Sequence, residues 1–301
     1  MKLTDLRGIL QYIPQFREKT FVISVDGGIV TDENFANIVM DIAVLRSLNI
    51  RVVLVHGASA QIKALAAEQG VAPSNLDGTG VTDEPTFKLA LTASNRLTHE
   101  ILEALSANDL RAACTNAMIA HPLGILHGED HLLTGKVERV DIEMLQKLLD
   151  IGIIPVLPPL GFDGDGKTYR VNSDGVALAA AEALKATKLM FLTMQDGIPV
   201  RDHVIRQVSV ADLESVLALQ KNDVQPDMLS KAIHGLAACK TGVPRVHIIN
   251  GRVEEGLLAE VFTNEGVGTL IYGNEFQQIR RAMKKDIRNI INMHEWNHIC
   301  T

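Results

Sequence analysis

Apolar runs and helical patterns alternate along most of the 301-residue chain. The runs "TFVISV" and "RVVLVH" are nearly continuous in apolar residues and end in glycine turns, which is typical of strands buried on both faces of a sheet. Apolar residues instead recur at helical intervals over residues 33–50, 60–69 and 85–105. Further strands are expected at 112–120, 189–193 and 245–249. This order predicts an α/β fold, a three-layer sandwich with a mostly parallel central sheet.

A separate helical pattern lies ahead of the first strand. Apolar residues recur there at helical spacing at Leu6, Ile9, Leu10, Ile13 and Phe16. Polar residues fill the positions between them, so we expect an amphipathic N-terminal helix. Between residues 123 and 140 the pattern changes to short alternating segments rich in glycine, which predicts an inserted hairpin region.

The stretch "GFDGDGKT", Gly161 to Thr168, has the spelling of a nucleotide-binding P-loop. A working P-loop lies between a buried strand and a helix whose N-terminal amides hold the phosphates, but no helical pattern begins at Lys167. Asp163 and Asp165 also lie inside the loop, where their carboxylates repel phosphate. Because aspartate-glycine pairs are strong turn formers, we expect a hairpin tip here and no ATP site.

Composition limits the classes of function. With 47% hydrophobic and 22% charged residues, the chain is able to bury a large core. Its net charge of -7 and its lack of basic runs with interleaved aromatics argue against nucleic acid or anionic membranes as partners. No apolar run reaches the length of a membrane span, and the three cysteines are too scattered for a disulfide framework or a zinc site. We expect a cytoplasmic protein without a metal or a cofactor, whose partners are small molecules and copies of itself.

Two glycine turns, Gly27-Gly28 and His56-Gly57-Ala58, follow predicted strands. Four long stretches resemble the amino-acid kinase family, and in particular the kinase-like domain of bacterial N-acetylglutamate synthases: "EKTFVISVDGG", "ENFANIVMDIAVLRSLNIRVVLVHGASAQI", "AHPLGILHGEDHLLTGKVERVD" and "GVGTLIYGNEFQQIRRAMKKDI". The resemblance covers almost the whole chain and implies an acetylglutamate kinase-like fold. It divides the chain into an oligomerisation helix at 1–19, a kinase-like domain at 20–274, and a linker with the truncated start of a GNAT acetyltransferase domain at 275–301.

The same resemblance implies that kinase chemistry is lost. Active kinases of the family carry a lysine, an aspartate and a substrate-binding arginine at the positions of Val25, Met194 and Gly80. Without these charges the transferred phosphoryl group is not stabilised, so no catalytic residue is predicted. Lys231 is the charged group that remains. We expect the following residues to line the remnant of the ligand pocket: Gly27, Gly28, Gly57, Asn172 and Lys231.

Arginine-sensitive members of the family bind L-arginine as a feedback inhibitor beside an N-terminal helix that joins dimers into a ring. In this chain Tyr12 lies at the position that the family uses near the effector, and "EEGLLAEVFTNEGVGT" resembles the effector segment. Glu260 is suited to a bidentate contact with a guanidinium group, and Gly266 and Gly268 let the backbone come close. The resemblance thus implies an L-arginine site at these residues, and a dimer or a hexameric ring. The kinases usually carry a histidine at the position of Glu255, and a solvated helix carboxylate is the other interpretation of Glu260.

The sequence leaves three hypotheses open. The first is a kinase-dead regulatory and assembly domain of an N-acetylglutamate synthase, which makes N-acetyl-L-glutamate from acetyl-CoA and L-glutamate in arginine synthesis. No Gln/Arg-x-x-Gly-x-Gly/Ala loop for the acetyl-CoA pyrophosphate occurs in the sequence, so this chain alone is expected to be inactive in acetyl transfer. The second is an ATP-dependent N-acetylglutamate kinase with unusual site residues that acts through Lys231. The third is a stand-alone arginine-sensing protein.

Overall fold

The computed structural model describes residues 12–200, 203–220, 225–262 and 266–273. Its first element is α2 (Ile13–Phe16), which corresponds to the end of the predicted N-terminal helix, whereas residues 1–11 lie outside the described ranges. The segment predicted to open an acetyltransferase domain also lies outside them. None of the helices in the described ranges combines the length and the apolar character that crossing a membrane requires.

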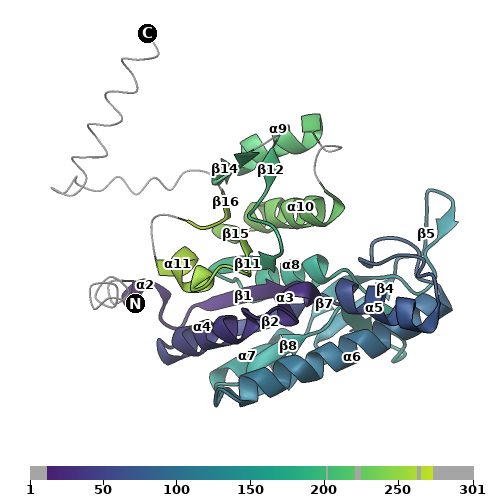
Figure 1. Cartoon of the computed structure of the whole chain (residues 1–301), viewed down its shortest axis with the longest axis horizontal. Helices are drawn as coiled ribbons and strands as arrows, with labels where there is room; N and C mark the ends of the chain where they lie inside the picture. Colours follow the sequence, from purple (N-terminus) through teal and green to yellow (C-terminus); the bar gives the residue numbers. More distant parts are fainter. Residues whose placement is uncertain (1–11, 201–202, 221–224, 263–265, 274–301) are drawn as a thin grey trace, which may run out of the picture.

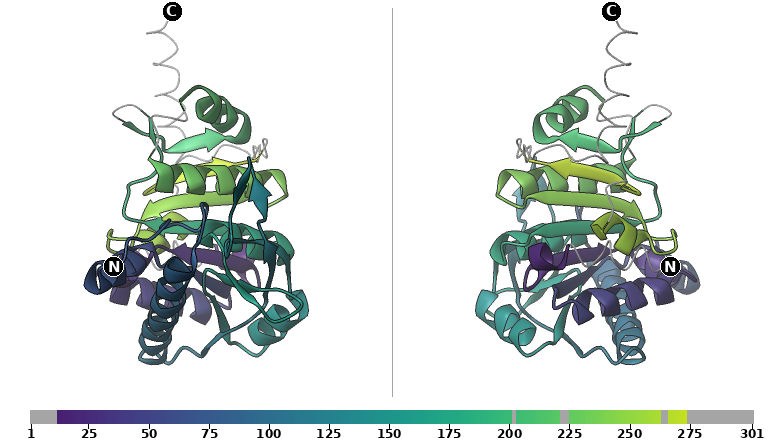
Figure 2. Two further views of the ribbon diagram at one scale, coloured as in Figure 1. Left: turned by 90° about the vertical axis from the view of Figure 1, so that its right-hand side faces the viewer. Right: turned by 90° about the vertical axis from the view of Figure 1, so that its left-hand side faces the viewer.

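An eight-stranded sheet forms the centre of the molecule, in the order β14-β16-β15-β11-β1-β2-β8-β3. In Figure 1 the sheet runs from β14 near the top to β8 near the bottom, and the side views of Figure 2 keep this order. Neighbouring strands are parallel throughout except for β15 and β16, which confirms the predicted mostly parallel sheet. The strands are β1 (Thr20–Val25), β2 (Arg51–His56), β3 (Ala112–Cys114), β8 (Ile154–Leu157), β11 (Lys188–Thr193), β14 (Gln207–Ser209), β15 (Arg245–Asn250) and β16 (Thr269–Tyr272).

Side-chain alternation along the strands buries one core on each face of the sheet. In β1, Phe21 and Ile23 pack into one hydrophobic cluster and Val22 into the other. The first cluster is covered by α3 (Gly27–Val30), α4 (Phe35–Ser47), α5 (Ser59–Gln69), α6 (Glu84–Ser106) and α11 (Gly256–Phe262). The second is covered by α7 (Ile142–Asp150), α8 (Ser173–Ala183), α9 (Val210–Gln220) and α10 (Pro226–Lys240). Helices on both faces make the predicted three-layer sandwich, which is therefore confirmed.

A four-stranded sheet in the order β10-β9-β4-β7 lies beside the main one. It contains β4 (Met118–Pro122), β7 (Gly135–Val140), β9 (Leu160–Phe162) and β10 (Thr168–Arg170). The predicted single strand over 112–120 is wrong, because β3 ends in the central sheet at Cys114 and β4 begins in the smaller sheet. Polar Thr115 and Asn116 separate the two strands, and Thr115 Oγ1 accepts a local hydrogen bond from the Ala117 amide at 3.4 Å.

Small hairpins account for the remaining strands. β5 (Ile125–Leu126) and β6 (Glu129–Asp130) form the predicted inserted hairpin, which projects at the right of Figure 1. β12 (Pro199–Val200) pairs with β13 (His203–Val204) near β14.

The P-loop-like stretch is a hairpin tip, as predicted. It connects the antiparallel strands β9 and β10. Asp163 Oδ1 accepts hydrogen bonds from the amides of Asp165 at 3.0 Å and Lys167 at 2.8 Å, and its Oδ2 accepts one from the Tyr169 hydroxyl at 3.1 Å. The carboxylate that would repel phosphate therefore closes the turn instead.

Candidate functional site

A cleft of about 150 Å³ lies at the carboxyl ends of β1, β2 and β11, where open parallel sheets usually bind ligands. The N-termini of α5, α8 and α10 adjoin it, because residues at the start of each helix line the cleft. The structure brings to this cleft all five residues that the resemblance implied for the ligand pocket: Gly27, Gly28, Gly57, Asn172 and Lys231.

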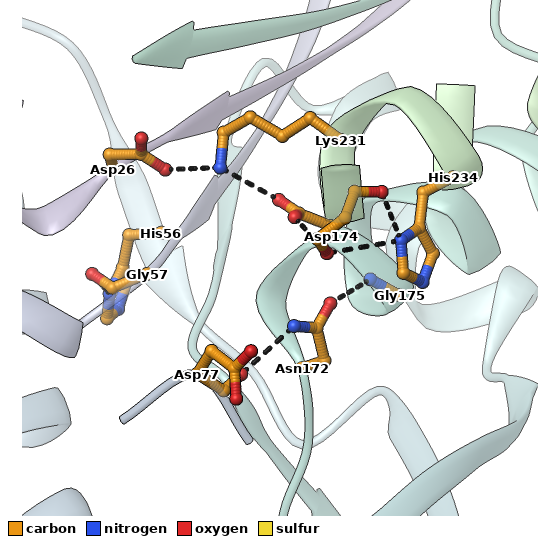
Figure 3. Close-up of polar contacts among 10 residues, drawn as sticks. Asp26, His56, Gly57, Asp77, Asn172, Asp174, Gly175, Lys231 and His234 are labelled. Carbon is orange, nitrogen blue, oxygen red and sulfur yellow. Dashed lines mark hydrogen bonds and ion pairs between the residues drawn. The ribbon is translucent and has the colours of Figure 1, made fainter. Parts of the chain in front are cut away.

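Lys231 of α10 is fixed between two aspartates (Figure 3). Its Nζ lies 2.9 Å from Asp26 Oδ1 and 3.4 Å from Asp174 Oδ1. Ser230 donates a hydrogen bond to the other oxygen of Asp174 at 2.6 Å. Since Lys231 and Asp174 are both buried, this arrangement is a buried ion-pair cluster and not a mobile surface contact.

The charges of this cluster compensate one another. Burial raises the pKa of Asp26, although Lys231 acts against it. Burial opposes the charged form of Lys231, but Asp174 and Asp26 outweigh burial and raise the pKa of the lysine. The ammonium therefore stays charged while its charge is cancelled locally. Asp77 and Asp227 also line the cleft, so its carboxylates outnumber its ammonium group.

Two polar side chains fasten the loop that forms the opposite wall of the cleft. Asn172 caps α8, because its Oδ1 accepts a hydrogen bond from the Gly175 amide at 3.0 Å, and its Nδ2 donates to the Asp77 carbonyl at 3.0 Å. Arg170 donates to the carbonyl and side-chain oxygens of Asn75 at 2.9 and 3.1 Å. Burial lowers the pKa of Arg170 to about 10, which leaves the guanidinium charged at neutral pH.

The two glycine turns lie against each other at the cleft. A Cβ atom at Gly27 would stand 2.1 Å from Gln61 Oε1 and 2.9 Å from the Gly57 carbonyl oxygen. Gln61 also donates from Nε2 to the Gly27 carbonyl at 2.8 Å. A side chain at Gly27 is therefore excluded by its neighbours, and the first turn needs glycine for this close approach.

The three positions that lack kinase residues lie in different surroundings. Val25 is the last residue of β1 and is buried in the hydrophobic core. Met194 lines the cleft, with its Sδ 3.6 Å from where a Cβ of Gly28 would lie. Gly80 lies away from the cleft lining, in the loop before α6, where its carbonyl accepts a hydrogen bond from Thr134 Oγ1 at 2.6 Å.

The residues predicted to bind arginine gather around α11, away from the cleft. Tyr12 stacks on Phe16 with ring centroids 6.3 Å apart and lies 6.2 Å from the ring of Phe262 in α11. Phe16 also packs edge-on against Phe21 of β1, and Lys188 Nζ lies over the Phe16 ring at 5.5 Å. This aromatic cluster attaches α2 to α11 and to the start of β11.

A buried row of ionisable side chains adjoins the aromatic cluster. Lys188 Nζ lies 2.9 Å from His247 Nε2, and His247 Nδ1 lies 2.6 Å from Glu260 Oε1. Glu260 Oε2 accepts hydrogen bonds from the amides of Val267 at 2.6 Å and Gly268 at 3.3 Å. Because an ionised carboxylate only accepts, His247 donates from Nδ1 and accepts at Nε2. Glu260 is 5% exposed, so its interpretation as a solvated helix carboxylate is wrong.

Burial sets the charges along this row. Burial and the nearby Arg245 lower the pKa of Lys188 to about 7. Burial and Lys188 lower the pKa of His247 to about 4. Burial disfavours the ionised form of Glu260, but the hydrogen bonds from His247 and the two amides more than compensate and lower its pKa. At neutral pH the row therefore holds an ionised Glu260, a neutral His247 and a lysine near its midpoint.

The two glycines of the predicted site differ in their surroundings. A Cβ atom at Gly266 would stand 3.2 Å from both carboxylate oxygens of Glu260. A Cβ atom at Gly268 would stand 2.0 Å from the Ile248 carbonyl oxygen, so Gly268 is required for packing against β15. A side chain at Gly266 would therefore crowd the buried Glu260 carboxylate.

Sequence reasoning missed the four ionisable residues that form the buried charged clusters with Lys231 and Glu260. Asp26 directly precedes the first glycine turn, and Asp174 lies within "VNSDG". Their positions at the end of a strand and the start of a helix were the only sequence features that could have marked them as site residues. Lys188 and His247 gave a weaker signal, as polar residues in the otherwise apolar strands "KLMFLT" and "RVHIIN". A charged residue at the start of a strand is usually exposed, so the sequence did not distinguish Lys188 from a surface lysine.

Comparison with known proteins establishes the family. The family model described as "Amino acid kinase family" matches residues 19–250. The chain belongs to the amino acid kinase family. Amino-acid acetyltransferases of Pseudomonas aeruginosa and Vibrio cholerae are 34% and 32% identical to this family member over 298 residues. These alignments cover 96% and 94% of this chain, and 68% and 67% of the relatives.

A solved structure supports the same relationship. The N-acetylglutamate synthase from Neisseria gonorrhoeae complexed with coenzyme A and L-arginine matches this family member with a TM-score of 0.85 and 31% sequence identity. The match covers 97% of this chain and 70% of that one. The implied acetylglutamate kinase-like fold is confirmed.

Proposed function

We propose that this family member is the kinase-fold regulatory and assembly module of an N-acetylglutamate synthase, and that it binds L-arginine beside α11. The observation that carries this proposal is the buried, ionised Glu260 carboxylate, which lies next to Gly266 and on the same helix as Phe262, the α11 contact of the N-terminal aromatic cluster. The gonococcal relative was solved with L-arginine, which supports the same ligand here. In this proposal the N-terminal 19 residues serve assembly into a dimer or a hexameric ring, and residues 20–274 form the ligand-binding domain.

The chemistry of Glu260 suits a guanidinium group. The amides of Val267 and Gly268 and the imidazole of His247 use only part of the capacity of its two oxygens, since a carboxylate has about four acceptor sites. The acceptor site that remains, on Oε1, suits one charge-assisted hydrogen bond from a guanidinium N–H. Tyr12 supplies an aromatic face near the same helix, where a cation is stabilised by the ring.

The cleft is proposed to transfer no phosphate. Lys231 already has its charge compensated by Asp26 and Asp174, and Met194 supplies no charge where the kinases carry an aspartate. Phosphoryl transfer needs positive charge close to the transferred group, whereas this lining is rich in carboxylates. A kinase that acts through Lys231 is therefore the less favoured function.

Acetyl transfer is proposed to depend on parts of the enzyme other than the kinase-like domain. The sequence lacks the pyrophosphate-binding loop of GNAT acetyltransferases, and the chain spans about two thirds of the length of its acetyltransferase relatives. We expect the purified 301-residue chain to make no N-acetyl-L-glutamate from acetyl-CoA and L-glutamate. Measurable production of N-acetyl-L-glutamate would overturn this part of the proposal.

Calorimetric titration tests the arginine site. The chain is titrated with L-arginine, L-ornithine and ATP with magnesium. We expect heat of binding for L-arginine only, because ornithine lacks the guanidinium group that donates to Glu260 and the cleft does not hold phosphates. Changing Glu260 to Gln is expected to weaken arginine binding by about 10- to 100-fold, since it removes a charge-assisted contact.

A matched variant separates a local contact from a general charge effect. Glu254→Gln changes the same charge at an exposed residue just before α11 and is expected to leave the affinity unchanged. Thermal unfolding of both variants checks that they fold. If the two variants bind L-arginine equally well, Glu260 is not the guanidinium partner. ATP binding without arginine binding would instead favour the kinase function, and arginine binding in the absence of a partner acetyltransferase is compatible with a stand-alone sensor.

A further inference from the structure

The row formed by Lys188, His247 and Glu260 has a proton balance that a cationic ligand disturbs. The two backbone amides and the imidazole fix Glu260 as an acceptor, so the proton that is free to leave the row is on Lys188. With Lys188 protonated, the row is a neutral ammonium-carboxylate pair bridged by an imidazole. With Lys188 deprotonated, the row carries one net negative charge, which attracts a cation more strongly.

We propose that binding of L-arginine at Glu260 releases a proton from Lys188, so that the site responds to pH as well as to arginine. The inference rests on the proposed arginine function and deepens it. Lys188 Nζ passes its proton to the solvent buffer, and the amine that remains still donates a hydrogen bond to His247 Nε2. No bond other than that N–H bond breaks.

The groups that face Lys188 support this coupling. Arg245 on β15 disfavours its charge and Glu260 on α11 favours it, while Phe16 of α2 covers the ammonium with its ring. Lys188 is 2% exposed, so solvent does not screen these interactions as it would at the surface. Burial together with Arg245 lowers the pKa of Lys188 to about 7, so the proton is exchangeable near neutral pH.

The size of the effect follows from Coulomb's law. A guanidinium that hydrogen-bonds to the remaining acceptor site of Glu260 Oε1 lies on the order of 10 Å from Lys188 Nζ, because the imidazole of His247 and its two hydrogen bonds separate the two groups. At an effective dielectric constant of about 20, a unit charge at that distance lowers a pKa by about one unit. Since ligand binding favours the deprotonated lysine, affinity increases with pH and levels off once Lys188 is deprotonated in the free protein. We expect about tenfold weaker binding at pH 5.5 than at pH 8, and release of about half a proton per ligand near pH 6.5.

Titration calorimetry in two buffers measures the released protons. The full chain is titrated with L-arginine at pH 6.5 in phosphate and in imidazole buffer, whose ionisation enthalpies differ, so the difference in observed heat counts protons. We expect release in both buffers and an affinity that increases between pH 5.5 and 8. Changing Lys188 to Met is expected to remove the release and the dependence on pH. Either lack of proton release by the unmodified chain or persistent release by Lys188→Met overturns the inference.

Substitution of two exposed arginines gives a second test of proton release from Lys188, and it leaves the buried row itself unchanged. Arg245→Gln removes a charge that faces Lys188, so the midpoint of the pH dependence is expected to move to higher pH. Arg252→Gln removes an arginine that pairs with Asp32 and is expected to leave the midpoint in place. Equal midpoints for the two variants would count against Lys188 as the source of the proton. Absence of arginine binding at every pH overturns the proposed function together with this inference, whereas binding without proton release overturns the inference alone.

Discussion

Replacement of Lys231 by methionine tests whether the ion-pair cluster of the cleft holds the fold together. The variant keeps the length of the side chain but leaves Asp26 and Asp174 close to each other without a cation. Breaking a buried ion pair by removing one partner typically costs about 3–5 kcal/mol, because an uncompensated charge stays buried. We expect a loss of that size in the free energy of unfolding at pH 7, measured by urea denaturation.

Lys240 provides a matched control on the same helix. It pairs with Glu214, but both side chains are about half exposed, and such surface pairs contribute about 0–1 kcal/mol. Lys240→Met therefore removes the same kind of charge without the burial. If Lys231→Met costs no more than Lys240→Met, the argument that the buried cluster compensates the Lys231 charge is refuted.

The pH dependence of the Lys231→Met variant gives an independent check. Burial already raises the pKa of Asp26, and loss of the lysine raises it further. A carboxyl group with a raised pKa in the folded state contributes stability below its unfolded pKa and loses it as pH rises through the folded pKa. The difference in the free energy of unfolding between the unmodified chain and Lys231→Met is thus expected to shrink as pH falls from 7 towards 4. A difference that is constant over this range would mean that the aspartates do not carry the cost.

Three further predictions concern stability. The pKa of Lys188 is lowered to about 7, so above that pH the unfolded chain binds more protons than the folded one. The free energy of unfolding is therefore expected to increase by about 1.4 kcal/mol per pH unit from pH 7.5 to 9. Denaturant titrations of Lys188→Met are expected to show no such increase. Burial lowers the pKa values of His56 and His247 to about 4, so each histidine lowers the free energy of unfolding by about 1.4 kcal/mol per pH unit as pH falls from 6.5 to 4. In the same assay, His56→Gln is expected to halve the pH dependence that these two histidines cause together. Asn172→Ala removes the cap of α8 and is expected to lower the free energy of unfolding by about 1–2 kcal/mol, seen as a lower denaturant midpoint at unchanged m.

Much of the fold was predictable because its signals are local. The apolar runs of β1, β2 and β11 and the helical spacing of α6 each lie within one segment, and the structure has them within one or two residues of the expected bounds. The division of 112–120 into β3 and β4 was not predictable in this way. Apolar residues in a short run show that a strand forms, but they do not show which of two sheets it joins.

The two sites differ in how much of each the sequence disclosed. The cleft residues were implied by the family resemblance, and the structure shows close approach of backbones at Gly27 and Gly57 within the two glycine turns. The ion pairs are long-range contacts: Lys231 and Asp174 are 57 residues apart, and Lys188 and His247 are 59. No spacing rule connects such residues, and only the register of β11 with β15 brings the second pair together.

One strand connects the two sites and also separates them. Lys188 begins β11 in the buried row, and Met194 follows its last residue at the cleft. Six residues of extended strand span about 20 Å, so a ligand at one site does not touch the other. Perturbations that far apart are additive within about 0.5 kcal/mol unless a two-state element links them. Changes at Lys231 are therefore expected to leave the affinity for L-arginine unchanged. A change in that affinity would indicate that β11, or a segment packed on it, moves between two states.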